Sequence, residues 1–267
     1  MSKILVCNPS CFSLEYEINP WMSMSNKPNE KIAEKQWNNF HDALSRCGAE
    51  LKYISPRTEV PDMVFVANAG LVRGNRVILS NFKHHERRPE KQYYKEWFLN
   101  NGYQVIEIPE HIIFEGAGDA LFLNNTLFMG HGFRTDIKAH QLIATALGVK
   151  VVSCELINPK FYHLDTCFYT SKNRIVYYKD AFSKKSLTKI LNAVTQEATD
   201  SGDYFDIVNV GKELAGQFVC NSVCIGENVI SPSIDCASVF YTNKITYCDM
   251  SEFIKAGGAI KCLTLQL

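Results

Sequence analysis

The sequence predicts an α/β fold of five repeated modules that close into a ring, and three observations support this prediction. Four hairpin patterns recur along the 267 residues, with turns near residues 74, 124, 173 and 226, a period of about 50 residues. A helical pattern and a short apolar run follow most hairpins, so the repeated unit is ββαβ. The two ends of the chain together supply a fifth unit. An open α/β sheet is the alternative arrangement.

The hairpin patterns are pairs of short apolar runs joined by turn residues. They span residues 70–79, 120–129, 167–178 and 222–230. Glycine or asparagine occupies each turn, and these two residues adopt the left-handed backbone most readily: Gly74, Asn124, Asn173 and Gly226.

Helical patterns follow the first three hairpins, at residues 89–100, 135–147 and about 183–197. Gly102 and Gly148 lie just beyond the first two, where a C-cap glycine is expected. Short strands come next, at residues 103–108, 149–152 and 204–208. The fifth unit combines a strand at 4–7, a helix at 30–47, a strand at 50–54 and the tail from residue 259.

Composition limits the class of protein and its partners. The 28 basic and 28 acidic residues balance, so no nucleic-acid or membrane partner is indicated. No apolar stretch has the length of a membrane-spanning helix, and the start reads as a strand instead of a signal peptide. We therefore expect one domain over residues 1–267, a cytoplasmic location and ten reduced cysteines. Association into a homo-oligomer is compatible with this interpretation.

Polar residues recur just before the hairpins, and one cysteine lies near the end of the chain. Asn68 precedes the first hairpin, Glu115 and Asp119 the second, and His163 and Asp165 the third; Cys262 follows Gly257-Gly258. In a ring of equivalent modules these positions converge, so we expect them to share a pocket. His163 and Asp165 are two residues apart and would face the same side of a strand.

This set of side chains suits one kind of chemistry. A cysteine thiolate is a strong nucleophile near neutral pH, and a histidine beside it can act as general acid and base. One carboxylate can orient the imidazole, and further carboxylates match the N–H groups of a guanidinium. Taken singly, each residue has an ordinary interpretation: Cys262 as a core residue, Glu115 and Asp119 as a polar turn, His163 as a local hydrogen-bonding group.

The ordered motifs resemble those of the guanidino-group modifying enzymes, the penteins. They are Phe65-x-x-Asn68-Ala, Glu115-Gly-x-Gly-Asp119, His163-Leu-Asp165-Thr and Gly-Gly-x-x-x-Cys262-Leu-Thr. The resemblance covers essentially the whole chain and implies a pentein propeller of five ββαβ modules around a central active site. It also implies that Cys262 is the nucleophile, that His163 is the general acid and base oriented by Glu115, and that Asp165 binds the guanidinium.

One position departs from the commonest pattern of the family. Arginine deiminases and dimethylarginine dimethylaminohydrolases carry an aspartate where this chain has Asn68. The asparagine, together with Glu17-Ile18-Asn19-Pro20-Trp21, is similar to arginine dihydrolases, which convert arginine to ornithine, ammonia and carbon dioxide through citrulline. The resemblance therefore favours a dihydrolase, with a citrulline-producing dimethylargininase or deiminase as the alternative. An amidinotransferase or a non-catalytic binding protein ranks lower.

The remaining expectations concern the ends of the substrate and the need for a cofactor. Arg87 and Arg134 are candidates for the carboxylate of arginine or a substituted arginine, and Asn19 and Asp119 for its amino-acid end or the surrounding shell. No motif has the spacing of metal ligands, so we expect neither a metal nor an organic cofactor.

Overall fold

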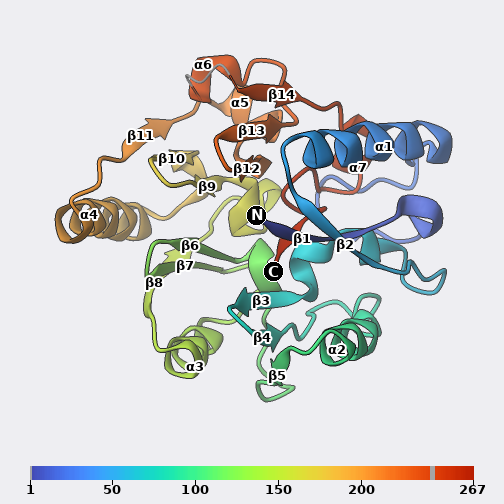
Figure 1. Cartoon of the computed structure of the whole chain (residues 1–267), viewed down its shortest axis with the longest axis horizontal. Helices are drawn as coiled ribbons and strands as arrows, with labels where there is room; N and C mark the ends of the chain where they lie inside the picture. Colours follow the sequence, from blue (N-terminus) through green and yellow to red (C-terminus); the bar gives the residue numbers. More distant parts are fainter. Residues whose placement is uncertain (1, 241–243) are drawn as a thin grey trace.

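The computed structural model describes residues 2–240 and 244–267 and arranges five three-stranded sheets around a common centre (Figure 1). Where the chain forms a hairpin, the inner strand runs antiparallel to the middle strand, and the middle strand runs parallel to the outer one. The parallel pairs need a crossover connection, which is why a helix or loop lies between them. The predicted ring of ββαβ modules is confirmed, in place of one open sheet.

The strands fall into three sets by their distance from the centre. The inner strands are β3 (Gly70–Arg73), β6 (Ala120–Leu123), β9 (Phe168–Thr170), β12 (Val223–Ile225) and β15 (Leu265–Gln266). The middle strands are β1 (Lys3–Cys7), β4 (Arg76–Leu79), β7 (Thr126–His131), β10 (Arg174–Tyr177) and β13 (Asn228–Ser231). The outer strands are β2 (Glu50–Ile54), β5 (Gln104–Ile106), β8 (Lys150–Glu155), β11 (Asp206–Asn209) and β14 (Ile245–Tyr247).

Helices lie on the outside of the ring (Figure 1). The four long ones are α1 (Glu30–Arg46), α2 (Glu90–Asn100), α3 (Ile137–Leu147) and α4 (Lys184–Ser201); the short ones are α5 (Lys212–Gly216), α6 (Ala237–Phe240) and α7 (Ser251–Ile254). In α1 the cap residue Asn29 accepts a hydrogen bond from the Ile32 N–H at 3.1 Å, and Trp37, Phe40 and Leu44 form the buried face. Within the described part of the chain, none of the helices has the length and apolarity needed to cross a membrane.

The two ends of the chain close the ring, as the sequence predicts. Strand β1 pairs antiparallel with β15, with Ile4 opposite Gln266, and parallel with β2, with Lys3 opposite Glu50. The tail differs from the expectation in one respect, because only Leu265–Gln266 is a strand. The preceding residues form a tight turn, in which the Leu263 N–H donates to the Ala259 carbonyl at 3.1 Å. Cys262 therefore lies on a turn at the centre of the ring.

Short 3₁₀ turns lead into the inner strands and bring polar residues to the centre. They are Pro61–Val64, Val66–Ala69, Gly116–Gly118, Leu164–Thr166 and Val219–Asn221. The expectation that His163 and Asp165 share a face of a strand is wrong, because the Thr166 side chain and N–H both donate to the His163 carbonyl and fold the segment into a turn.

Candidate active site

One narrow pocket gathers most of the side chains singled out from the sequence. Asn19, Asn68, Arg87, Arg134, His163 and Cys262 all line it, although they come from segments far apart in the chain. Glu115, Asp119 and Asp165 lie behind this lining and are fully buried. The convergence follows from the ring, since each module delivers its 3₁₀ turn to the same centre.

A buried ion-pair network holds the histidine. The His163 Nε2 atom lies 2.7 Å from Glu115 Oε2, and the Arg134 guanidinium donates to the same oxygen at 2.9 Å. Burial acts to raise the pKa of Glu115, but Arg134 and the hydrogen bond with His163 outweigh it and hold that pKa well below its usual range. Glu115 is therefore a carboxylate at every working pH. The hydrogen bond to this carboxylate fixes the orientation of the imidazole.

Two groups from other modules hold the cysteine. The Asn221 side-chain amide donates to Cys262 Sγ at 3.2 Å, and its Oδ1 accepts from the Cys262 N–H at 3.2 Å. The thiol itself donates to Asp165 Oδ2 at 3.4 Å. Burial raises the pKa of Cys262 far above its usual range, and the nearby Asp165 raises it further. At rest Cys262 is thus a protonated thiol, a state that the sequence by itself left open.

Burial also sets the state of Asp165. It raises the pKa of this carboxyl group to about 6, although the charge of Lys261 pulls the pKa down. The second oxygen, Oδ1, is buried and has no hydrogen-bond partner among residues 2–240 and 244–267. A ligand that offers N–H groups or positive charge near Cys262 would supply that partner.

Asn68 is held in one orientation by two neighbours. Its Oδ1 accepts from the Arg87 guanidinium at 2.9 Å, and its Nδ2 donates to the Glu115 carbonyl at 3.0 Å. Because a guanidinium only donates, the oxygen of Asn68 must face Arg87. Arg87 in turn forms two bonds to the buried Glu90, at 2.7 and 2.8 Å. The amide is therefore a fixed donor and acceptor at the wall of the pocket.

The other predicted residues lie where they support the pocket. Asn19 donates to the Ala256 carbonyl at 3.0 Å, which ties the N-terminal loop to the tail. Asp119 does not line the pocket, and its carboxylate accepts from the Leu164 N–H at 3.0 Å and the Thr135 hydroxyl at 2.7 Å. In the structure Asp119 therefore stabilises the turn that carries His163. Its contact with substrate stays a prediction.

Two further residues belong to the site and were missed in the sequence. Asp62 lines the pocket, and its buried Oδ2 makes no hydrogen bond of ordinary length to the described residues, although the Tyr16 side chain is close enough to lower the pKa of this carboxyl group. Asn221 holds the cysteine. The repeat could have identified Asn221, because it precedes β12 by two residues as Asn68 precedes β3. Asp62 sits in an apolar run, and nothing local marks it.

Gly118 provides a test of how tightly the site is packed. A Cβ at this position would clash with the Asn68 side chain and lie 3.4 Å from His163 Nδ1. Gly118 has no positive φ, so the effect of Gly118→Ala is purely steric. We expect the free energy of unfolding to drop by about 1–3 kcal/mol, together with a large loss of activity. Chemical denaturation and turnover assays measure both effects.

Gly216 is the matched control for this substitution. It ends α5, and beyond its chain neighbours and its own helix no atom of the described residues lies within 4 Å of an added Cβ. Gly216→Ala should leave activity unchanged and raise stability by about 0.5–1 kcal/mol. If Gly118→Ala behaved in the same way, the close packing of Gly118, Asn68 and His163 would be wrong.

Comparison with known proteins identifies a family and relatives that match nearly the whole of this chain. The family model described as N,N dimethylarginine dimethylhydrolase, eukaryotic, matches residues 8–267. The bifunctional arginine dihydrolase/ornithine cyclodeaminase ArgZ of Synechocystis sp. is 40% identical over 273 residues, covering 99% of this chain and 37% of the relative. The chain thus spans well under half of that bifunctional protein.

Two further similarities cover most of both chains. The N(G),N(G)-dimethylarginine dimethylaminohydrolase of Mycobacterium tuberculosis is 34% identical over 267 residues, covering 97% of this chain and 83% of the relative. A crystal structure of the N-terminal domain of ArgZ, in a mutant form bound to substrate, is 38% identical with a TM-score of 0.89. That match covers 100% of this chain and 98% of the domain, which is described as an arginine dihydrolase from the ornithine–ammonia cycle in cyanobacteria.

Proposed function

Because the chain belongs to the N,N-dimethylarginine dimethylhydrolase family, we propose that it hydrolyses guanidino C–N bonds and acts as an arginine dihydrolase. In this reaction one arginine and two waters give ornithine, two ammonia and carbon dioxide, with citrulline as the intermediate. Asn68 carries the proposal, because it places a neutral, oriented amide where a carboxylate would favour only a cationic ligand.

The first half of the reaction uses the residues around Cys262. The guanidinium of arginine supplies N–H donors to the buried oxygens of Asp62 and Asp165, which make no hydrogen bond of ordinary length within the described part of the chain. The cation also favours ionisation of the Cys262 thiol, whose Sγ then attacks the guanidinium carbon. His163 protonates the departing ammonia and afterwards removes a proton from the attacking water. Glu115 stabilises the imidazolium during both transfers.

The second half repeats this cycle on a neutral group. The ureido carbon of citrulline is attacked by Cys262, and the second ammonia leaves. Water then cleaves the sulfur–carbon bond and releases a carbamate of ornithine, which loses carbon dioxide. Asn68 supports this half because its amide can donate to the ureido oxygen, whereas a carboxylate at neutral pH has no N–H to give.

The proposal also names the residues that bind the substrate carboxylate and the compartment in which the protein works. Arg87 and Arg134 line the pocket and are the candidates for the substrate carboxylate. We place the protein in the cytoplasm, since all ten of its cysteines are free. The described residues contain no group of three or more His, Cys, Asp or Glu side chains placed to hold a metal ion.

A dimethylargininase or deiminase that stops at citrulline is the second candidate. The similarity to the mycobacterial dimethylaminohydrolase favours it, because that match covers most of both chains. The two candidates differ in products and in substrate. Arginine, citrulline and N,N-dimethylarginine, each supplied alone, should give ornithine from the first two if the chain is a dihydrolase. Release of citrulline as the end product, or much faster turnover of dimethylarginine, would reject the dihydrolase.

Asn68→Asp tests the residue on which the choice rests. The substitution is nearly isosteric, and the Arg87 guanidinium can pair with the new carboxylate, so the fold should tolerate it. We expect the ratio of citrulline to ornithine to rise at least tenfold, about 1.4 kcal/mol of selectivity between the two hydrolyses. Product analysis under single-turnover and steady-state conditions measures this ratio.

Asn158→Asp is the control for the same chemical change. Its Oδ1 accepts a hydrogen bond from the Lys160 N–H at 3.2 Å, an acceptor role that aspartate can keep, and it does not line the pocket. The product ratio of Asn158→Asp should equal that of the wild type. An unchanged ratio in Asn68→Asp would mean that Asn68 only shapes the turn Val66–Ala69.

A further inference from the structure

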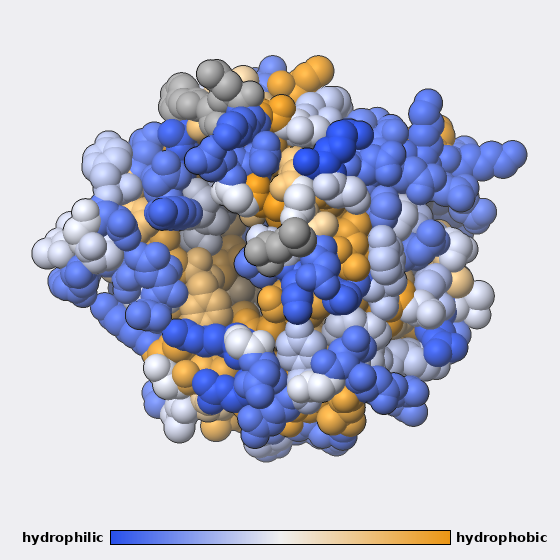
Figure 2. Space-filling view, viewed as in Figure 1, coloured by the Kyte–Doolittle hydropathy of each residue, from blue (hydrophilic) through white to orange (hydrophobic). Residues whose placement is uncertain are grey.

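A second cavity lies at the centre of the ring, apart from the catalytic pocket. Figure 2 shows the hollow at the middle of this face of the molecule, with apolar residues on its wall. Its volume is about 640 Å³, within the range of small-molecule sites. The inner strands β3, β6, β9, β12 and β15 form its wall, and the hairpin turns form its rim. We call it the central cavity.

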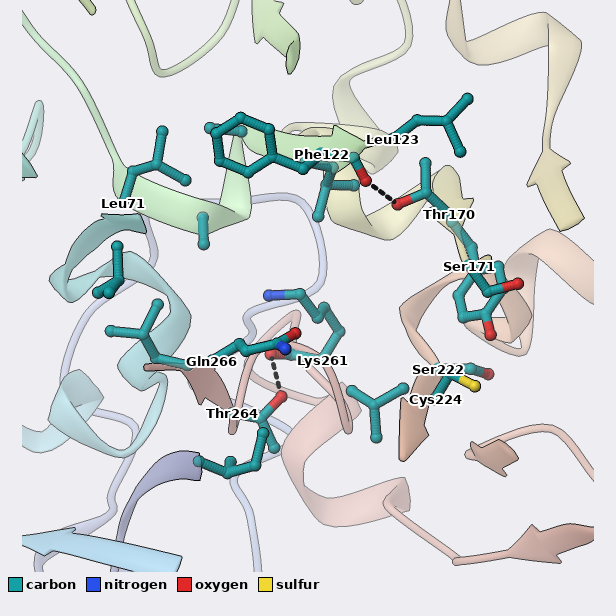
Figure 3. Close-up of a pocket in the computed structure, with 18 of the residues that line it drawn as sticks. Leu71, Phe122, Leu123, Thr170, Ser171, Ser222, Cys224, Lys261, Thr264 and Gln266 are labelled. Carbon is teal, nitrogen blue, oxygen red and sulfur yellow. Dashed lines mark hydrogen bonds between the residues drawn. The ribbon is translucent and has the colours of Figure 1, made fainter. Parts of the chain in front are cut away.

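One cationic side chain extends into the central cavity. Lys261 is partly buried, and its amine points into the space between the inner strands (Figure 3). The amine has no hydrogen-bond or ion-pair partner among the described residues. Burial lowers the pKa of Lys261, and only Asp165 and Cys262, on the far side of the turn, counteract this. A partly dehydrated amine without a neighbouring acceptor is a costly arrangement that an anion would relieve.

The remaining lining supports an anion and disfavours a cation. Arg73 and Lys172 also line the central cavity, whereas none of its described lining residues is Asp or Glu. The Arg73 guanidinium stacks on Phe122 of the wall, and its buried Nη1 has no hydrogen-bond partner in the part of the chain that the structure describes. Thr170, Ser171 and Gln266 add neutral polar groups beside the apolar ones (Figure 3). The combination fits a small molecule with an anionic group and a short body.

The central cavity and the catalytic pocket meet at one turn. Lys261 lines the first and Cys262 lines the second, although they are adjacent in the chain. The Lys261 N–H donates to the Asn221 carbonyl at 3.0 Å, and the side chain of Asn221 holds the thiol of Cys262. The charge of Lys261 therefore acts on the catalytic cysteine and on Asp165 from the side of the central cavity.

We propose that the central cavity binds a small organic oxyanion, a carboxylate or a phosphate, which pairs with Lys261 and lowers turnover at Cys262. Pairing neutralises the positive charge that otherwise favours the ionised forms of Asp165 and Cys262. Ionisation of the thiol then becomes harder, so the nucleophile forms more slowly. Substrate still reaches the catalytic pocket, because the two cavities have no lining residue in common.

Calorimetric titration tests binding without reference to any reaction. Inorganic phosphate, succinate and citrate are titrated separately into the wild-type protein at constant ionic strength and neutral pH. We expect saturable binding in the millimolar range or tighter for at least one of them, and the three arms distinguish phosphate from carboxylate ligands. No saturation by any of the three would overturn the proposal, whatever the substrate of the enzyme.

Lys261→Met identifies the site. Methionine keeps the length of the side chain and removes a charge that has no partner, so the melting temperature should stay the same or rise. We expect affinity for the anion to drop at least tenfold. Lys95→Met is the control, because Lys95 lies on α2 and pairs with Glu107 at 2.6 Å, far from the lining residues. Equal affinity in Lys261→Met and wild type would exclude the central cavity as the site.

The affinity of a rim variant and the effect of the anion on turnover test the proposal further. Lys172 lies on an exposed turn at the rim, so Lys172→Glu should fold and should weaken binding through charge reversal; unchanged affinity would contradict the site.

Turnover is then measured with and without the anion. Inhibition of the wild type that disappears in Lys261→Met supports the coupling, and binding that leaves wild-type turnover unchanged overturns it.

Discussion

Cys262→Ser is expected to lower kcat by about a thousandfold or more and to leave the fold intact. The substitution replaces one atom, and Asn221 and Asp165 can hydrogen-bond to a hydroxyl as they do to the thiol. A serine hydroxyl, however, is far harder to ionise in this buried position than a thiol, whose own pKa burial already raises. Steady-state turnover, with substrate affinity measured separately by calorimetry, should show lost catalysis with retained binding.

Cys154→Ser is the matched control, because Cys154 is also fully buried and its pKa is also raised by burial. It lies on β8 and does not line the catalytic pocket, so activity should be retained. A serine variant at 262 that keeps more than a few per cent of wild-type turnover would rule out covalent catalysis by this residue. General thiol reagents are a poor substitute for this test, because Cys11, Cys47 and Cys224 are more accessible than Cys262.

Glu115→Gln is expected to lower kcat by about 10²–10⁴-fold, because it removes the charge that stabilises the protonated His163. It also leaves the buried guanidinium of Arg134 without its anionic partner. The free energy of unfolding at neutral pH should therefore fall by about 3–5 kcal/mol. Turnover assays and denaturant titration measure the two effects separately.

The pH dependence of stability gives an independent check on Glu115. Its folded-state pKa lies below the unfolded value of about 4.3, so its contribution to stability is present above that pH. The contribution is lost as the pH falls through the folded pKa. The difference in stability between the wild type and Glu115→Gln should accordingly shrink in strongly acidic solution. A difference that stayed constant down to low pH would contradict the charged state assigned to Glu115.

Two other variants decide whether Glu115 acts through His163. His163→Ala should lower kcat about as much as Glu115→Gln, and the double variant should lose little more, because the two side chains act as a unit. Glu252→Gln is the control for a buried carboxylate, since Glu252 pairs with Lys255 at 2.7 Å on α7. It should cost stability and spare kcat. Additive losses in the double variant would mean that Glu115 acts independently of His163.

Local sequence patterns were sufficient to predict the modules. Gly74 and Gly226 have positive φ in the turns where the hairpins were expected, and Asn124 does the same in a third. The pairing of β1 with β15 and β2 was also predictable, because neither end of the chain supplies a whole module alone. These features depend on neighbours in the chain and on a repeat, which the sequence displays directly.

The state of the site was decided by tertiary structure. Local patterns could not show that Cys262 is a buried, protonated thiol, because the desolvation of its side chain depends on how the other modules pack around it. They could not identify Asp62, whose importance comes from its buried place in the lining of the catalytic pocket. They also could not place Lys261 and Cys262 in separate cavities. That division arises because the 259–264 segment forms a turn across the centre of the ring, so that the consecutive residues Lys261 and Cys262 line different cavities.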